Sequence, residues 1–187
     1  MDYIALGKSD LMVSRTAFGA MSLKDIADEE SAAILVHQAY DAGVNFFDSS
    51  HSTRESETRL GSCLHGIRQD VILATKSSAA SGSELLSDLE GSLDALHTDY
   101  IDLFQYETEN ILPLPGGADG ICAAFDSAVA SGKVRHIGIT TQNEKVAFAL
   151  ATGSSVFETL QYPFNLLTGE ESLQIVSECA KNDVGFI

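Results

Sequence analysis

Polar and charged residues stand at the ends of several apolar, strand-like segments of this sequence. They are Asp48, Lys76, Glu107, Thr140, Thr141 and Gln161. Any one of them alone is as readily a solvated strand end as a functional group. An aspartate and a lysine that end neighbouring strands, however, would form a partly buried ion pair of the kind found in active sites. The pairing of Asp48 with Lys76 therefore favours a functional site at these strand ends.

The composition limits the partners of such a site. The formal net charge is −16 and the sequence pI is about 4.4, so nucleic acid and anionic membranes are not expected partners. No apolar run reaches the ~18 residues of a membrane span, and the first residues lack the apolar core of a signal peptide. We expect a cytoplasmic protein that acts on a small molecule, in an oligomeric state that the sequence leaves open.

The cysteine and histidine positions do not predict a metal site. Cys63, Cys122 and Cys179 are far apart and form no C-x-x-C motif, so buried free thiols are expected. The five histidines show neither H-x-H nor H-E-x-x-H spacing. We therefore expect no bound metal.

The elements that must position the strand-end residues alternate regularly along the chain. A hairpin is expected around 7–10, and helices are expected from Asp28 to Gly43, from Ser56 to Gly66, and over 83–96, 119–130, 144–151 and 171–180. The apolar, strand-like segments cover 16–19, 44–48, 71–76, 100–106, 134–140, 158–162 and 184–187. The segments lack period-two polarity, as is typical of parallel strands that are buried on both faces.

Six strand–helix units followed by a seventh strand fit two architectures, a doubly wound open sheet and a (β/α)8 barrel of the TIM type. A doubly wound sheet that binds a dinucleotide is expected to carry G-x-G-x-x-G after its first strand. The sequence after Gly19 lacks this motif. The barrel is therefore predicted, as one domain over residues 1–187 with its active site at the carboxyl ends of the strands. A barrel usually needs ~250 residues, so we expect this one to be cut in strand seven. Such a piece would leave open strand edges, associate, and bind a dinucleotide poorly.

Six sequence segments, in this order and spacing, resemble the aldo-keto reductase family. They begin at Tyr3 (YIALGKSDLMVS), Gly43 (GVNFFD), Ser56 (SETRLG), Ile72 (ILATK), Leu93 (with DYIDL from Asp99) and Gly132 (GKVRHIGI). The resemblance covers essentially the whole chain, and it implies a nicotinamide-dependent reductase of carbonyls. Its cofactor would be NADP, with NAD left open.

The resemblance assigns roles residue by residue. Asp48 matches the family's aspartate and Lys76 its lysine, whereas Thr53 stands at the position of its tyrosine and Glu107 at that of its histidine. Cofactor contacts are implied for Gly19, Ala20 and Met21 in the loop after the first strand, for Asp48, for Thr140 and Thr141 at the Ser-Asn position, and for Gln161. The family's phosphate-binding loops, and the iron-sulfur segment of one branch, belong beyond Ile187.

Thr53 and Glu107 change the expected chemistry. A threonine hydroxyl ionises far above the phenol's ~10, so Lys76 cannot make Thr53 a comparable proton donor. Tyr106 does not replace it, because strand alternation points it away from the barrel axis. A carboxyl in an apolar pocket can stay protonated and donate a proton. A branch of the family that reduces carbon–carbon double bonds carries glutamate at the position of Glu107.

Three readings remain open. The first is an oxidoreductase with altered active-site chemistry that reduces a carbonyl or an activated double bond. The second is a catalytically silent barrel that binds a nucleotide or another small ligand. The third is a non-redox enzyme that uses Lys76 and Glu107 as acid and base. Asp48, Lys76 and Gln161 favour the first reading, and Thr53 favours the other two.

Overall fold

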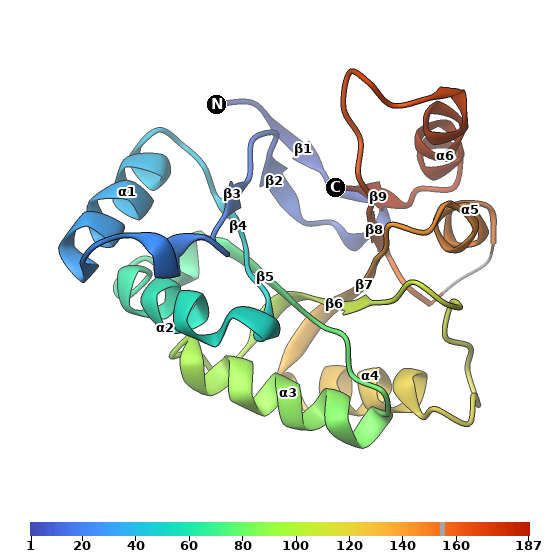
Figure 1. Cartoon of the computed structure of the whole chain (residues 1–187), viewed down its shortest axis with the longest axis horizontal. Helices are drawn as coiled ribbons and strands as arrows, with labels where there is room; N and C mark the ends of the chain where they lie inside the picture. Colours follow the sequence, from blue (N-terminus) through green and yellow to red (C-terminus); the bar gives the residue numbers. More distant parts are fainter. Residues whose placement is uncertain (154–155) are drawn as a thin grey trace.

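A single parallel sheet of seven strands forms the centre of the computed structural model, which describes residues 1–153 and 156–187. The strands follow one another in the order β3-β4-β5-β6-β7-β8-β9. Their bounds are Phe18–Gly19, Phe46–Asp48, Ile72–Ser77, Ile101–Glu107, Val134–Thr140, Thr159–Gln161 and Gly185–Phe186. Figure 1 shows the sheet curled, with the helices on its outer side. This is a partly closed barrel of the TIM type, as predicted, and not a doubly wound open sheet.

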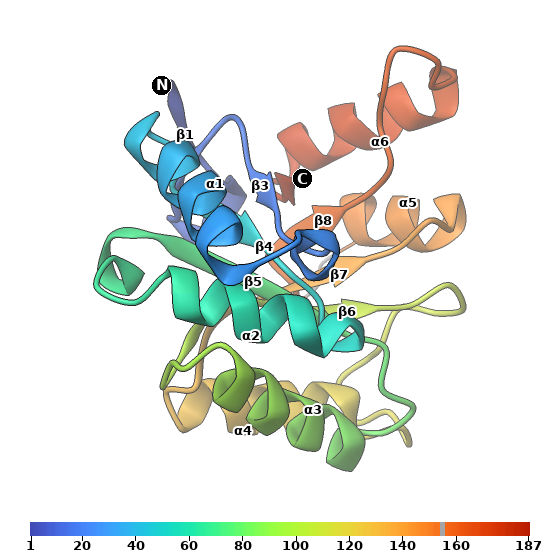
Figure 2. The ribbon, with the colours of Figure 1, turned by 60° about the vertical axis from the view of Figure 1, so that its left-hand side comes forward.

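In the part of the chain that the structure describes, α-helices connect the strands and cover the outside of the curl (Figure 2). They are α1 (Glu29–Asp41), α2 (Arg54–Cys63), α3 (Gly82–Ala95), α4 (Ile121–Ala130), α5 (Glu144–Thr152) and α6 (Glu170–Lys181). The predicted cap of α1 is observed, because Asp28 accepts a hydrogen bond from the Ser31 amide at 2.7 Å. Each helix returns the chain to start another parallel strand beside the previous one, so the carboxyl ends of all the strands meet at one edge.

The starts of α2 and α4 differ from the prediction by two residues, for local reasons. Helix α2 begins at Arg54 and not at Ser56, because the short 3-10 turn His51–Thr53 leads directly into it. Helix α4 begins after Asp119, whose carboxylate accepts from the Ile121 amide at 2.9 Å. Asp119 therefore lies outside the helix, just before the N-cap residue Gly120.

The predicted hairpin consists of β1 (Tyr3–Ala5) and β2 (Met12–Ser14), which pair antiparallel. Asn45 ties it to the start of β4, because its side chain accepts from the Ser14 amide at 2.7 Å and donates to the Met12 carbonyl at 2.9 Å. The hairpin's turn also meets the last strand. Gly7 has a φ of 55°, and a Cβ there would lie 2.2 Å from the Gly185 nitrogen, so only glycine fits this approach.

Apolar side chains pack on both sides of the sheet. A large cluster lies between the sheet and the helices and includes Phe47, Phe104 and Phe125. A smaller one lies inside the curl near the hairpin, where Leu6, Val13, Phe46, Ala74 and Leu103 meet. The inner cluster fills the end of the curl that the hairpin covers, so polar inward-facing residues are left at the opposite end.

Candidate active site

An ion pair between Asp48 and Lys76 forms the floor of the candidate site. Asp48 is the last residue of β4, and Lys76 comes one residue before the end of β5. The Lys76 ammonium donates to Asp48 Oδ2 at 2.7 Å and to the Ser49 carbonyl at 2.8 Å. Asp48 and Lys76 are 9% and 5% exposed, so the pair is shielded from water and Lys76 is held in one position.

Gln161, on β8, reaches the same carboxylate from across the curl. Its Nε2 donates to Asp48 Oδ2 at 3.2 Å. Its Oε1 accepts from Thr140 Oγ1 at 3.0 Å and from Gln105 Nε2 at 3.3 Å. The Gln161 amide therefore has its oxygen toward Thr140 and Gln105 and its nitrogen toward Asp48. Side chains from β4, β5, β6, β7 and β8 therefore form one connected network.

A cavity of about 370 Å³ opens above this network. Its walls include Met21, Asp48, Lys76, Glu107, Glu109, Thr140, Thr141, Gln142, Gln161, Tyr162, Pro163 and Ile187. A second cavity, of about 690 Å³, lies over the carboxyl ends of β5 and β6 and shares Glu107, Glu109 and Gln142 with the first. Both volumes fall in the range of small-molecule sites. The two cavities together form a cleft with room for two adjoining molecules.

Glu107 stands between the two cavities. It is the last residue of β6 and lies opposite Thr140 of β7. The neighbouring Tyr106 lines only the second cavity, and its hydroxyl donates to the Ala79 carbonyl at 3.1 Å. Burial raises the pKa of Tyr106. Glu107, like Glu109, is therefore a carboxyl side chain that lines both halves of the cleft.

Thr53 is placed differently from the other residues singled out in the sequence. It precedes α2, and its hydroxyl donates to the Ser50 carbonyl at 3.0 Å. It is not part of either cavity wall as described. Gly19 and Ala20 are also outside the walls, and Ala20 is fully buried with its amide on the Asp48 carbonyl at 2.8 Å. Of the loop after the first strand, only Met21 reaches the cavity.

Sequence reasoning did not single out Gln105, Ser49 or Glu109 for this site. Gln105 had a usable signal, because it lies two residues before Glu107 on one strand and must face the same side. Its Oε1 and Asp48 Oδ1 are buried atoms for which the described residues supply no hydrogen-bond partner. Such atoms point to a missing ligand or water.

Two further observations concern metals and membranes. In the described ranges, no group of three or more histidine, cysteine, aspartate or glutamate side chains is arranged to hold a metal ion. Within the same ranges, no helix has both the length and the apolar character needed to cross a membrane. Cys63, Cys122 and Cys179 are buried free thiols, as predicted.

The order of the strands and the aspartate–lysine pair at their carboxyl ends agree with the comparison to known families. The sequence profile described as "Aldo/keto reductase family" matches residues 15–187. The chain belongs to this family. The aldo-keto reductase dtxS3 of Metarhizium robertsii is 28% identical over 239 residues, which cover 100% of this chain and 63% of the relative.

One further relative and one solved structure are also similar to the chain. The 6-dehydroglucose reductase of Novosphingobium aromaticivorans is 35% identical over 154 residues, covering 72% of this chain and 50% of that protein. The holo structure of aldo-keto reductase AKR11C1 from Bacillus halodurans superposes with a TM-score of 0.84 at 26% identity, over 100% of this chain and 65% of the other. The chain thus matches between half and two-thirds of the length of these curated relatives.

Proposed function

We propose that this aldo-keto reductase family member uses NADPH to reduce a small-molecule carbonyl or an activated double bond. The observation that carries the proposal is the connected network of Lys76, Asp48 and Gln161 at the floor of the cleft. The relative named 6-dehydroglucose reductase supports an oxidised carbon as the target. The preference for NADPH over NADH in this proposal comes only from the resemblance to the aldo-keto reductase family.

The residues present fit the nicotinamide end of such a cofactor. The first cavity admits one ring and not a whole dinucleotide. Gln161 and Thr140 offer an amide and a hydroxyl, which are the donor and acceptor groups that a carboxamide requires. Buried Asp48 Oδ1 is an acceptor still without a partner in the described part of the chain. The cofactor, when bound, supplies the hydride.

The chain's own residues would then bind and protonate the substrate. The second cavity, which Glu107 joins to the first, is the place for the substrate. The Lys76 ammonium would draw electron density toward the substrate oxygen, and Asp48 keeps it in place. Glu107 would hold the proton on its carboxyl oxygen and deliver it to the substrate. Thr53 takes no part, since its hydroxyl is engaged with the Ser50 carbonyl.

That engagement of Thr53 favours a second function, a barrel that binds a nucleotide or small ligand without turnover. A non-redox reaction that uses Lys76 and Glu107 as acid and base is the third. Both of these alternative functions would use the same cleft as the proposed reductase. The three functions therefore differ in whether NADPH binds and in whether its hydride is consumed.

Saturation-transfer NMR with NADPH tests the proposed binding site without requiring tight affinity. We expect the nicotinamide protons to receive more saturation than the adenine protons, and Gln161→Leu to abolish this difference. Lys133→Met, which removes an exposed lysine paired with Glu90, is the matched control and should behave as the unmodified chain. Binding through the adenine alone, or no transfer at all, would overturn the NADPH proposal. Nicotinamide contact without consumption of NADPH by any aldehyde or enone would favour the silent barrel.

A further inference from the structure

Lys76 has a polar neighbour on each side along β5, and both neighbours face the helices. Thr75 donates from Oγ1 to Glu57 Oε1 on α2 at 2.7 Å. Ser77 donates from Oγ to Asp88 Oδ2 on α3 at 2.5 Å. The strand segment that carries Lys76 is therefore anchored at both ends on the side away from the cavity.

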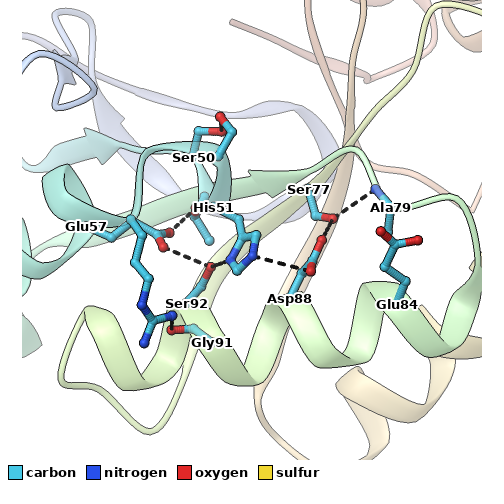
Figure 3. A network of polar contacts seen from close by, with 12 residues as sticks. Ser50, His51, Glu57, Ser77, Ala79, Glu84, Asp88, Gly91 and Ser92 are labelled. Carbon is cyan, nitrogen blue, oxygen red and sulfur yellow. Dashed lines mark hydrogen bonds and ion pairs between the residues drawn. The ribbon is translucent and has the colours of Figure 1, made fainter.

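Two further side chains connect these anchors, as Figure 3 shows. Ser92 of α3 donates to Glu57 Oε2 at 3.1 Å and lies 3.1 Å from His51 Nδ1. His51 Nε2 lies 3.3 Å from Asp88 Oδ1. The six side chains Thr75, Glu57, Ser92, His51, Asp88 and Ser77 thus form a closed circuit behind Lys76, here called the polar ring.

The polar ring also reaches the other partners of Lys76. His51 lies in the turn that follows Asp48, two residues after Ser49, whose carbonyl accepts from the Lys76 ammonium. Glu57, Ser92 and Thr75 are fully buried, so water does not replace a lost contact at these three positions. The polar ring therefore fixes both the strand of Lys76 and the turn that receives its ammonium.

The protons in the ring can be counted from the contacts. When Glu57 is ionised, Ser92 gives it its one proton, so His51 must donate from Nδ1 to Ser92 and from Nε2 to Asp88 as an imidazolium. When Glu57 is protonated, it donates to Ser92, Ser92 donates to Nδ1, and a neutral His51 donates from Nε2 to Asp88. Both arrangements hold the same number of protons and satisfy every contact.

Removal of that one proton breaks the circuit. With Glu57 ionised and His51 neutral, one of the three contacts Glu57–Ser92, Ser92–His51 and His51–Asp88 is left with lone pairs alone on both atoms. The other charged groups do not remedy this. Arg54 on α2 donates to the Gly91 carbonyl and pairs with Asp94, and Glu84 on α3 accepts from the Ala80 amide.

We propose that Glu57, Ser92 and His51 are positioning residues for Lys76, and that they hold one shared proton that keeps the polar ring closed. Burial raises the pKa of Glu57, which agrees with a proton held on this side of the ring. A group with a raised folded pKa stabilises the fold at low pH and loses that effect as pH rises. The ring is therefore closed on the acidic side and opens toward alkaline pH. This inference depends on geometry and not on the proposed reductase activity.

Glu57→Gln is the decisive variant, because its amide accepts from Thr75 and donates to Ser92 without the shared proton. In the intact chain with ¹⁵N-labelled histidine, the His51 ring signals, assigned by their loss in His51→Gln, should change as pH rises. In Glu57→Gln they should remain those of a neutral ring protonated on Nε2. The same titration in both proteins would overturn the proposal.

Modification of the Lys76 amine with trinitrobenzenesulfonate reports how firmly Lys76 is held. Mass spectrometry measures the modified fraction of Lys76, which is divided by that of Lys181. In the unmodified chain, Lys76 should be protected at low pH and become roughly fivefold more reactive once the ring opens, as expected for one lost hydrogen bond. Glu57→Gln should stay protected throughout, and Ser92→Ala should be reactive at every pH. Ser62→Ala on α2, whose hydroxyl bonds only the Thr58 carbonyl, is the control. Equal protection in Ser92→Ala and the unmodified chain would refute the positioning role.

Discussion

Gln161 and Asp48 are joined by a hydrogen bond of 3.2 Å that crosses the interior of the curled sheet from β8 to β4. The bond converges on the same carboxylate oxygen that accepts from Lys76. It thereby connects the half of the sheet that carries the charged pair to the half that carries the amide and hydroxyl groups. We expect the loss of this bond to destabilise the cleft, and a charge introduced at Gln161 to act directly on Asp48.

Substitution of Gln161 should reveal that dependence. Gln161→Met removes the donor to Asp48 and the acceptor of Thr140, and should cost about 1–3 kcal/mol of unfolding free energy. Gln161→Glu should cost more at neutral pH, because it places a second carboxylate beside Asp48 Oδ2, and should regain stability as pH falls and the new carboxyl is protonated. Urea unfolding at several pH values measures both. A Gln161→Glu protein as stable as Gln161→Met at neutral pH would contradict this account.

The proton donor is tested by Thr53→Tyr. We expect the unmodified protein to reduce simple aldehydes with NADPH far more slowly than the ~10 per second typical of enzymes, because Thr53 supplies no phenol. Thr53→Tyr should raise the rate, measured as NADPH consumption, while Ser52→Tyr should not. Fast aldehyde reduction by the unmodified protein would show that another group, with Glu107 the first candidate, is a sufficient acid.

Asp102 should be the most sensitive acidic residue on the outer side of the sheet. It is 2% exposed and pairs with Arg68 and Arg135, whose guanidinium groups lie 4.1 and 3.9 Å from the Tyr100 ring centroid. Asp102→Asn leaves the partly buried Arg68 without its counter-charge and should cost about 3 kcal/mol. Asp94→Asn breaks an exposed pair with Arg54 and should change stability by less than about 1 kcal/mol. Equal effects in thermal or urea unfolding would rule out this difference.

The three thiols should be unreactive in the folded protein. Burial raises the pKa of Cys179 to about 11 and raises those of Cys63 and Cys122, so little thiolate exists near pH 8. A disulfide reagent should label all three only after addition of denaturant. Because the folded pKa of Cys179 lies above its unfolded value, stability should decline as pH rises toward 11. Rapid labelling of native protein at pH 8 would count against this packing.

The fold followed from the sequence because its signals are local. The apolar strands, the Asp28 cap and the turn at Gly43 each depend on neighbouring residues, so strand order could be derived from simple alternation. Asp48, Lys76 and Gln161 could be singled out because the strand ends of a barrel are where a site is expected.

The polar ring could not be found in this way. His51 and Glu57 lie in a polar stretch typical of a solvent-exposed segment, and their contacts depend on α3, which is distant in sequence. Thr53 shows the same limit, because its position in the sequence suggested the cavity, whereas the turn before α2 directs its hydroxyl to a backbone carbonyl.

The close approach of Gly7 to Gly185 has a consequence for biosynthesis. The Lys8 amide donates to the Asp183 carbonyl at 2.8 Å, so the hairpin's turn docks against a segment that the ribosome makes much later. The strands between them can pair with their neighbours as each emerges, but the hairpin's turn must wait until residues 183–185 have been translated. A contact of such long range slows folding. The hairpin's turn should therefore dock late, onto a sheet that has already assembled in order from β3 to β9.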